Sequence, residues 1–193
     1  MAINATADAS FGPQLGRGQL DFTLAFEQAI FGIGPSELLL AAASLRISIL
    51  RQREPLFRVG HLLWAKLTAA ALLLGLELVS LVLWSTSPPP ARTHVALAAA
   101  SLAVADVEAM ASLLYTEHRH AFSPSLLLST YLLVSALLDV VGIRSLFLRG
   151  DLDALGAVAS ATLALKLVMT GLEEVPKRGP AALRTSKEMA RGL

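Results

Sequence analysis

Three acidic residues that interrupt long apolar stretches are the side chains of this sequence best suited to catalysis. They are Glu77, Asp106 and Asp139. A carboxylic acid in an apolar site can stay protonated and act as a general acid on an epoxide, an alkene or a carbonyl. The sequence therefore permits an enzymatic hypothesis: a membrane cyclase or isomerase that acts on a lipophilic metabolite, with Tyr131 and Arg144 as auxiliary groups.

The same acids also have a structural interpretation, which we favour. Ionisable side chains inside a membrane usually face neighbouring helices, where they pair with one another. The further residues that we expect to be buried polar groups or ion-pair partners are Lys66, Glu108, Arg144 and Lys166. Their depth in the apolar stretches predicts that Lys66, Lys166 and Glu108 form one ion-pair set near the inner side of the membrane.

The acids cannot form a catalytic pair within one helix. Asp106 and Glu108 are two positions apart, so their side chains project about 200° apart around a helix. We expect Glu77 and Asp139 nearer the outer side, with Arg144 beyond Asp139, and Asp106 near the middle without an obvious cation. A catalytic site would therefore need acids from different helices.

A polar stretch, Glu117-His118-Arg119-His120, lies between two apolar runs. Imidazoles can bind zinc, but a spacing of two residues is poor geometry on a helix, and the sequence offers no other convergent ligands. We therefore predict no metal site and interpret these residues as a short cytosolic loop.

The composition is typical of a polytopic membrane protein. Of the 193 residues, 54% are hydrophobic and 16% are charged, against about 25% charged in soluble domains. The mean hydropathy is +0.61. There is no cysteine, which excludes disulfides and thiol catalysis. With a net charge of +1 and no glycine-rich phosphate loop, the sequence predicts neither a nucleic-acid partner nor a cofactor.

Five apolar stretches are long enough, or nearly so, to cross a bilayer. They predict an all-α integral membrane fold, a bundle of five transmembrane helices occupying 26–172, with the lipid bilayer as its surroundings. Gly32, Gly34 and Pro35 predict a kink or a late start in the first helix. The five stretches are 26–45, 61–85, 94–115, 125–144 and 153–172.

The distribution of Lys and Arg predicts the orientation of this bundle. Ten basic residues lie in the segments 46–58, 116–124 and 173–193, and four lie in the opposite loops and the N-terminal segment. We therefore expect residues 1–25 outside the cytosol and 173–193 as a basic cytosolic tail. This orientation would expose Asn4, in the sequon Asn4-Ala5-Thr6, to glycosylation.

The chain resembles the N-terminal membrane domain of fungal multidrug-resistance-associated ABC transporters of subfamily C. The resemblance covers about residues 20–178. It implies a five-helix accessory domain with its N-terminus outside, which in that family precedes transport and nucleotide-binding domains and serves trafficking, regulation and partner contact. The matching stretches are "DFTLAFEQAIFGIGPSELLL" (21–40), "LLWAKL" (62–67), "LVLWS" (81–85), "EHRHAFSPSLLLSTYL" (117–132), "DVVGIRSLFL" (139–148) and "ALKLVMTGLEE" (164–174).

Glu77, Asp106 and Glu108 depart from this resemblance, because we expect neutral or apolar residues at their positions. Our favoured hypothesis is a stand-alone accessory domain without an ATPase of its own. It would assist a larger ABC transporter, or another membrane protein, in exporting or handling a lipophilic secondary metabolite. The alternatives are the cyclase or isomerase described above, which would bind a lipophilic small molecule, and a small channel or carrier.

Overall fold

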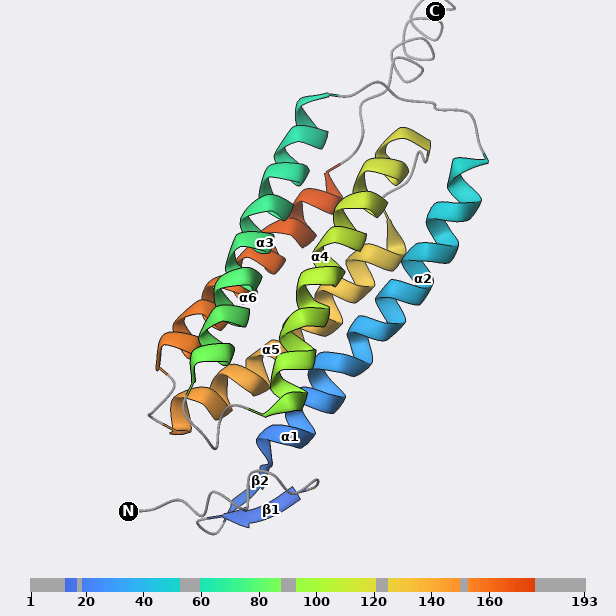
Figure 1. Cartoon of the computed structure of the whole chain (residues 1–193). Coiled ribbons are helices and arrows are strands. Elements are labelled where there is room, and N and C mark those ends of the chain that lie inside the picture. Colours follow the sequence, from blue (N-terminus) through green and yellow to red (C-terminus); the bar gives the residue numbers. More distant parts are fainter. Residues whose placement is uncertain are drawn as a thin grey trace, which may run out of the picture.

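Five helical spans form the membrane part of the protein (Figure 1). The computed structural model describes residues 13–16, 19–52, 60–87, 93–120, 125–149 and 153–175. In this part, five helices are long and apolar enough to cross a membrane, which confirms the predicted number. The first span joins α1 (Leu24–Glu27), the π-helical segment η1 (Gln28–Ile33) and α2 (Gly34–Arg51); the others are α3 (His61–Thr86), α4 (His94–His120), α5 (Leu126–Arg149) and α6 (Asp153–Glu174).

Three of the helices start at hydroxyl residues that cap them. The side-chain oxygen of Thr93 accepts the backbone N–H of Ala96 at 3.0 Å, and that of Ser125 accepts the N–H of Leu128 at 3.1 Å. Thr23 does the same for Phe26 at 3.3 Å. Each cap satisfies an N–H group that has no partner within its own helix. Local sequence therefore sets where α1, α4 and α5 begin.

Pro35 explains the irregularity predicted in the first span. A proline has no N–H to donate, and its ring collides with the carbonyl four residues earlier. The chain widens here into η1, so that the N–H of Gly34 bonds to the carbonyl of Ala29, five residues back, while Pro35 falls in the first turn of α2. The span thus carries a π-helical turn and then continues as a regular helix.

A short antiparallel hairpin precedes the bundle and was not predicted. Strands β1 (Pro13–Gly16) and β2 (Gln19–Phe22) pair with Gly16 opposite Gln19. Four-residue strands are shorter than usual, and a lone hairpin is only marginally stable. The available signal was the pair Arg17-Gly18, since two-residue connections containing glycine are typical of hairpins.

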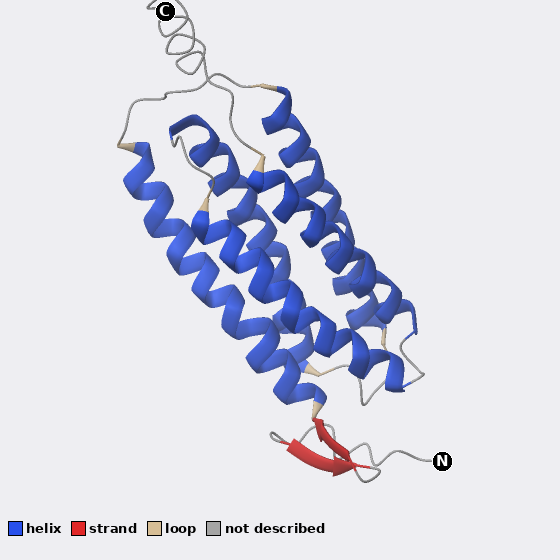
Figure 2. Ribbon diagram, turned by 180° about the vertical axis from the view of Figure 1, so that it is seen from behind, coloured by secondary structure: helices blue, strands red, loops and turns tan. Residues whose placement is uncertain are grey.

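The helices pack around a common axis (Figures 1 and 2). α4 packs against α2 and α3, α3 also packs against α6, and α6 packs against α5, while α5 touches α2 and η1 more lightly. β1 and β2 lie beside one end, here named the hairpin end, where α3 and α5 finish. The opposite end, where α2, α4 and α6 finish, is named the tail end.

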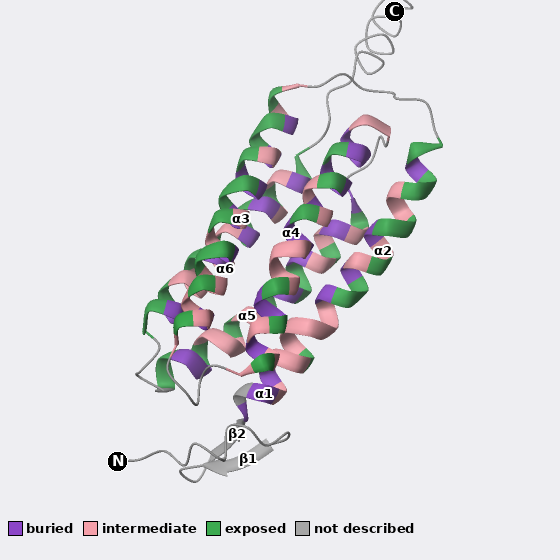
Figure 3. Ribbon diagram, in the orientation of Figure 1, coloured by how far each residue is buried: buried purple, intermediate pink, exposed green. Residues whose placement is uncertain are grey.

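Apolar side chains point both into and out of the bundle. One buried cluster lies toward the tail end and includes Leu73, Met110 and Leu132. A second lies at the hairpin end and includes Trp84 and Leu155. Many large apolar residues are exposed. Figure 3 shows that exposed positions lie on the outward-facing parts of the helices. Such a surface matches a protein whose helices are surrounded by lipid.

Candidate functional site

A partly open cavity of about 170 Å³ lies between the helices, beside the two apolar clusters, and all five spans line it. Its walls reach from Leu73 and Met110 to Trp84 and Leu155. Among the described lining residues, four are acidic and one is basic. The acids are Glu27, Glu77, Asp106 and Asp139, and the base is Lys166. The three acids that the sequence singled out are thus brought together from three different helices.

Asp106 of α4 is the most deeply buried of these acids, with 2% of its surface exposed. The Tyr131 hydroxyl of α5 donates a hydrogen bond to its Oδ2 at 2.9 Å. The Ser36 side chain also lies within hydrogen-bonding range of this carboxyl, but its single hydroxyl proton is donated to the carbonyl of Gly32 at 2.9 Å. Within the described part of the chain, Oδ1 of Asp106 has no hydrogen-bond partner. One oxygen of a buried carboxyl in the cavity wall is therefore unsatisfied.

Lys166 of α6 forms the only direct ion pair in the cavity wall among the residues described. Its Nζ lies 2.7 Å from Oδ2 of Asp139. Glu77 lies within electrostatic range of both Lys166 and Asp139, but makes no ion pair of its own with any described residue. Lys166 is thus the one lysine described among the acids Glu77, Asp106 and Asp139 in the middle of the bundle.

Glu27 is a member of this group that sequence reasoning missed. It is buried at the hairpin end, and the Ser145 hydroxyl of α5 donates a hydrogen bond to its Oε1. The signal was present, because Glu27 lies within the predicted span 26–45, only one residue from its start. The expected buried polar residues nevertheless did not include it.

The expected set of Lys66, Lys166 and Glu108 does not exist. Lys66 of α3 pairs instead with Glu173 of α6 at 2.8 Å near the tail end, with both side chains almost fully buried. Glu108 is exposed on the outer face of α4, since it projects away from the buried Asp106. The depth estimate failed because it ignored the direction in which each side chain projects.

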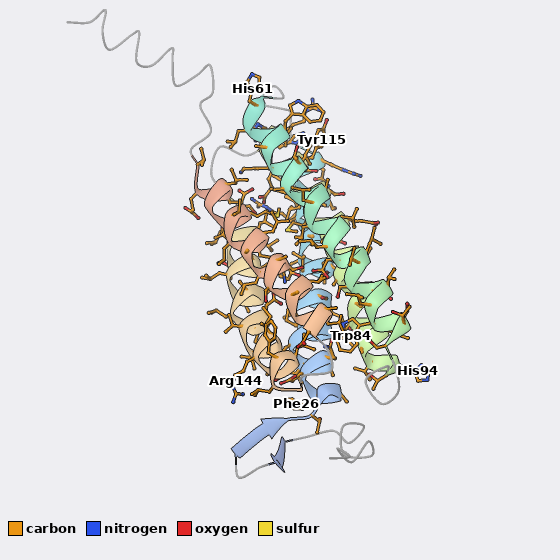
Figure 4. The ribbon with its side chains drawn as sticks, turned by 90° about the vertical axis from the view of Figure 1, so that its left-hand side faces the viewer. Phe26, His61, Trp84, His94, Tyr115 and Arg144 are labelled. Carbon is orange, nitrogen blue, oxygen red and sulfur yellow. The ribbon has the colours of Figure 1, made fainter. Side chains whose placement is uncertain are left out.

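Arg144 is also exposed and does not join Asp139. Figure 4 shows it at the hairpin end, with His94 and Phe26, while His61 and Tyr115 lie at the opposite end. Arg144 follows Asp139 by five residues, which is more than a full helical turn. Its exposure corrects the expectation of a buried partner.

The stretch Glu117-His118-Arg119-His120 is the last turn of α4 and not a loop. Glu117 and His118 are buried, and Glu117 accepts a bond from Arg46 of α2 at 3.0 Å. The ring of His120 bonds to the carbonyl of Thr116 at 2.8 Å. The guanidinium of Arg119 bonds to the Tyr115 hydroxyl at 2.9 Å. These contacts attach the end of α4 to α2 and to its own preceding turn.

Several predicted features lie outside the described residues. They are the sequon at Asn4, most of the N-terminal segment 1–25, and nearly all of the basic tail 173–193. The described residues contain no group of three or more His, Asp or Glu side chains arranged to hold a metal ion. The acids of the cavity wall place carboxyl oxygens, which accept hydrogen bonds, between the helices.

Comparison with known proteins gives consistent matches along most of the chain. The family model described as "ABC transporter TMD0 domain" matches residues 9–162. An ABC-type transporter of Gibberella zeae is 34% identical over 180 residues, which cover 91% of this chain. An ABC multidrug transporter of Purpureocillium lilacinum is 35% identical over 90% of the chain, and ABC multidrug transporter B of Aspergillus fumigatus is 36% identical over 84%. The matched part is only 12%, 12% and 11% of these relatives, respectively.

Proposed function

Because this chain belongs to the family of ABC transporter TMD0 domains, we propose that it is an accessory membrane module that assists ABC-type export of a lipophilic metabolite. The family membership confirms the resemblance drawn from the sequence, and the chain is an integral multi-pass membrane protein. The observation that carries the proposal is that the match extends through four whole spans and into the fifth, within relatives named as transporters. The cyclase or isomerase hypothesis has no support in these comparisons.

The proposal assigns an orientation to the bundle. The tail end would face the cytosol, because the described basic residues Arg46, Arg51 and Arg119 lie there, and the segment 53–58 adds two more arginines in sequence. Positively charged residues favour the cytosolic side of a membrane. The hairpin end would then face outward, and the sequon at Asn4 precedes the hairpin in the sequence.

The absence of cysteine makes this orientation directly testable. Single variants Ser10→Cys and Ser186→Cys would each carry the only thiol in the chain. In intact cells, a membrane-impermeant maleimide should label Ser10→Cys and should reach Ser186→Cys only after the membrane is permeabilised. The reverse pattern would contradict the proposed orientation and, with it, the cytosolic contact described next.

The proposed contact with a transporter core runs through the arginine-rich segment that follows α2. Arg46 lies in the last part of α2, just before this segment, and its pairing with Glu117 attaches α2 to α4. A transporter core at the cytosolic surface could then contact the arginines at 51, 53 and 58 through complementary charges. Electrostatic complementarity of this kind sets partner choice more than affinity.

Co-purification with an ABC transporter core of the same fungal family would test this contact. The triple variant Arg51→Glu, Arg53→Glu and Arg58→Glu should lose at least nine-tenths of the co-purified core and reduce export of lipophilic compounds. The matched control Arg92→Glu with Arg144→Glu reverses one charge shortly before α4 in the sequence and one exposed charge at the hairpin end. It should retain the co-purified core and the export. Equal losses in the two variants, or none in the triple variant, would contradict the proposal.

A further inference from the structure

We propose that the interior cavity is a binding site for a small lipophilic amine, held by Asp106 through its protonated ammonium group. This inference is independent of the accessory role, because it rests on the geometry of the cavity. It also differs from the enzymatic hypothesis, since no bond is made or broken. Three observations carry it: an unsatisfied oxygen, an excess of acids, and the size of the space.

The unsatisfied oxygen is Oδ1 of Asp106. It is buried in the cavity wall without a hydrogen-bond partner in the described part of the chain, although Oδ2 accepts a bond from Tyr131. An unpaired buried acceptor costs free energy, so it is expected to have a donor in the functional state. Tyr131 holds the carboxyl in one orientation, and this leaves Oδ1 available to a bound ligand.

The excess of acids defines the charge of that ligand. The cavity is lined by four acids and one lysine in the described part, and Lys166 already pairs with Asp139. Among the described residues, Asp106 and Glu77 therefore have no direct ion-pair partner of their own. A buried carboxylate is stabilised by an opposite charge within hydrogen-bond distance. This pattern favours an ammonium group and disfavours an anionic ligand.

The size and the remaining walls define the rest of the ligand. A cavity of about 170 Å³ is close to the roughly 150 Å³ apolar cavity that accepts a benzene molecule. Trp84, Leu73 and Val107 supply apolar surface in the same walls. A divalent metal ion fits less well, because the described acids do not converge as a ligand set. The geometry points to an amine with one aromatic ring and a short chain.

Tryptophan fluorescence offers a direct test. The chain has two tryptophans: Trp64 is exposed, whereas Trp84 is buried and lines the cavity. In the full 193-residue chain carrying Trp64→Phe, in lipid nanodiscs, 2-phenylethylammonium should change the Trp84 emission saturably. Its neutral analogue 2-phenylethanol should bind at least tenfold more weakly. No saturable change, or equal binding of the two compounds, would overturn the proposal and leave water as the partner of Oδ1.

Two variants and one control identify the residue responsible. Asp106→Asn should weaken amine binding at least tenfold, whereas Glu108→Gln, an exposed acid on the same helix, should leave it within twofold. Gly142→Leu adds apolar bulk at a residue of the cavity wall without changing any charge, and a Cβ at Gly142 meets no atom within 4 Å. It should abolish binding, and it decides the question if Asp106→Asn fails to fold. Unchanged binding in Gly142→Leu would place the amine elsewhere and overturn the proposal.

Discussion

The tail end of the bundle and its middle use buried charges in different ways. Toward the tail end, Lys66 pairs with Glu173 and Arg46 pairs with Glu117. Among the described residues around the cavity, the single base Lys166 stands among four acids. Paired charges fix how helices pack, whereas an uneven group with space beside it is suited to binding. Charged residues within one membrane domain can therefore have separate structural and ligand-binding roles.

Removing Lys66 should have the largest effect on stability and would test the structural role. In Lys66→Met, the almost fully buried Glu173 is left without its cation. Breaking one partner of a buried pair costs about 3–5 kcal/mol. We expect a loss of this size in the free energy of unfolding, measured by titrating micelle-bound protein with a denaturing detergent and following far-ultraviolet circular dichroism.

The double variant Lys66→Met with Glu173→Leu provides the control for that prediction. It removes both charges, so most of the lost stability should return. If the single variant loses less than about 1 kcal/mol, which is the usual value for a solvent-exposed pair, water reaches the tail end and the proposed contrast with the cavity is wrong.

Removing Asp139 should have a smaller effect, because the cavity contains a substitute. In Asp139→Asn, Lys166 loses its partner at 2.7 Å, but Glu77 remains within electrostatic range. We expect a loss of about 1–3 kcal/mol, the cost of an unsatisfied polar group, in the same unfolding measurement. In the variant Asp139→Asn with Glu77→Gln, the loss should exceed the sum of the two single losses. Simple additivity would mean that Glu77 does not support Lys166.

The contrast between these regions shows what the sequence could and could not predict. Span length and apolar composition predict the five helices, and Pro35 predicts the irregularity in the first of them, because each is a local property of the chain. The acids at 77, 106 and 139 were found for the same reason, since each interrupts an apolar run. The pairing of Lys66 with Glu173 was not found, because it depends on which helices become neighbours.

The sequence also did not show toward which side of its helix bundle each side chain projects. Asp106 and Glu108 differ by two positions, yet one lines the cavity and the other is exposed. Sequence showed that they diverge but not which one faces inward. For the same reason the burial of Glu117 at the end of α4 was not predicted, and its polar stretch was interpreted as a loop. Packing against α2 decides that burial, and local sequence does not.

A close helix contact near the cavity gives a third, smaller prediction. A Cβ added at Gly32 would lie 3.1 Å from the Cβ of Ala99 on α4, so Gly32→Ala should force the two helices apart. Overpacking of this kind costs about 1–3 kcal/mol, and we expect the lower half of that range because only one methyl group is added. The unfolding measurement should show the loss, and Ala99→Gly in the same chain should restore it. A loss that Ala99→Gly cannot restore would have a cause other than this contact.

The smallest effect is expected from Arg46→Ala, which tests whether exposure separates the two ion pairs near the tail end. The Arg46 side chain is 41% exposed, whereas that of Lys66 is 3% exposed. An ion pair with one solvent-accessible partner contributes about 0.2–1 kcal/mol, because water and salt screen it. Glu117 also has a further interaction besides this pair. We therefore expect at most about 1 kcal/mol in the unfolding measurement, with sensitivity to salt that Lys66→Met lacks. A loss as large as that of Lys66→Met would show that the buried carboxylate of Glu117, and not the exposure of its partner, determines the strength of the pair.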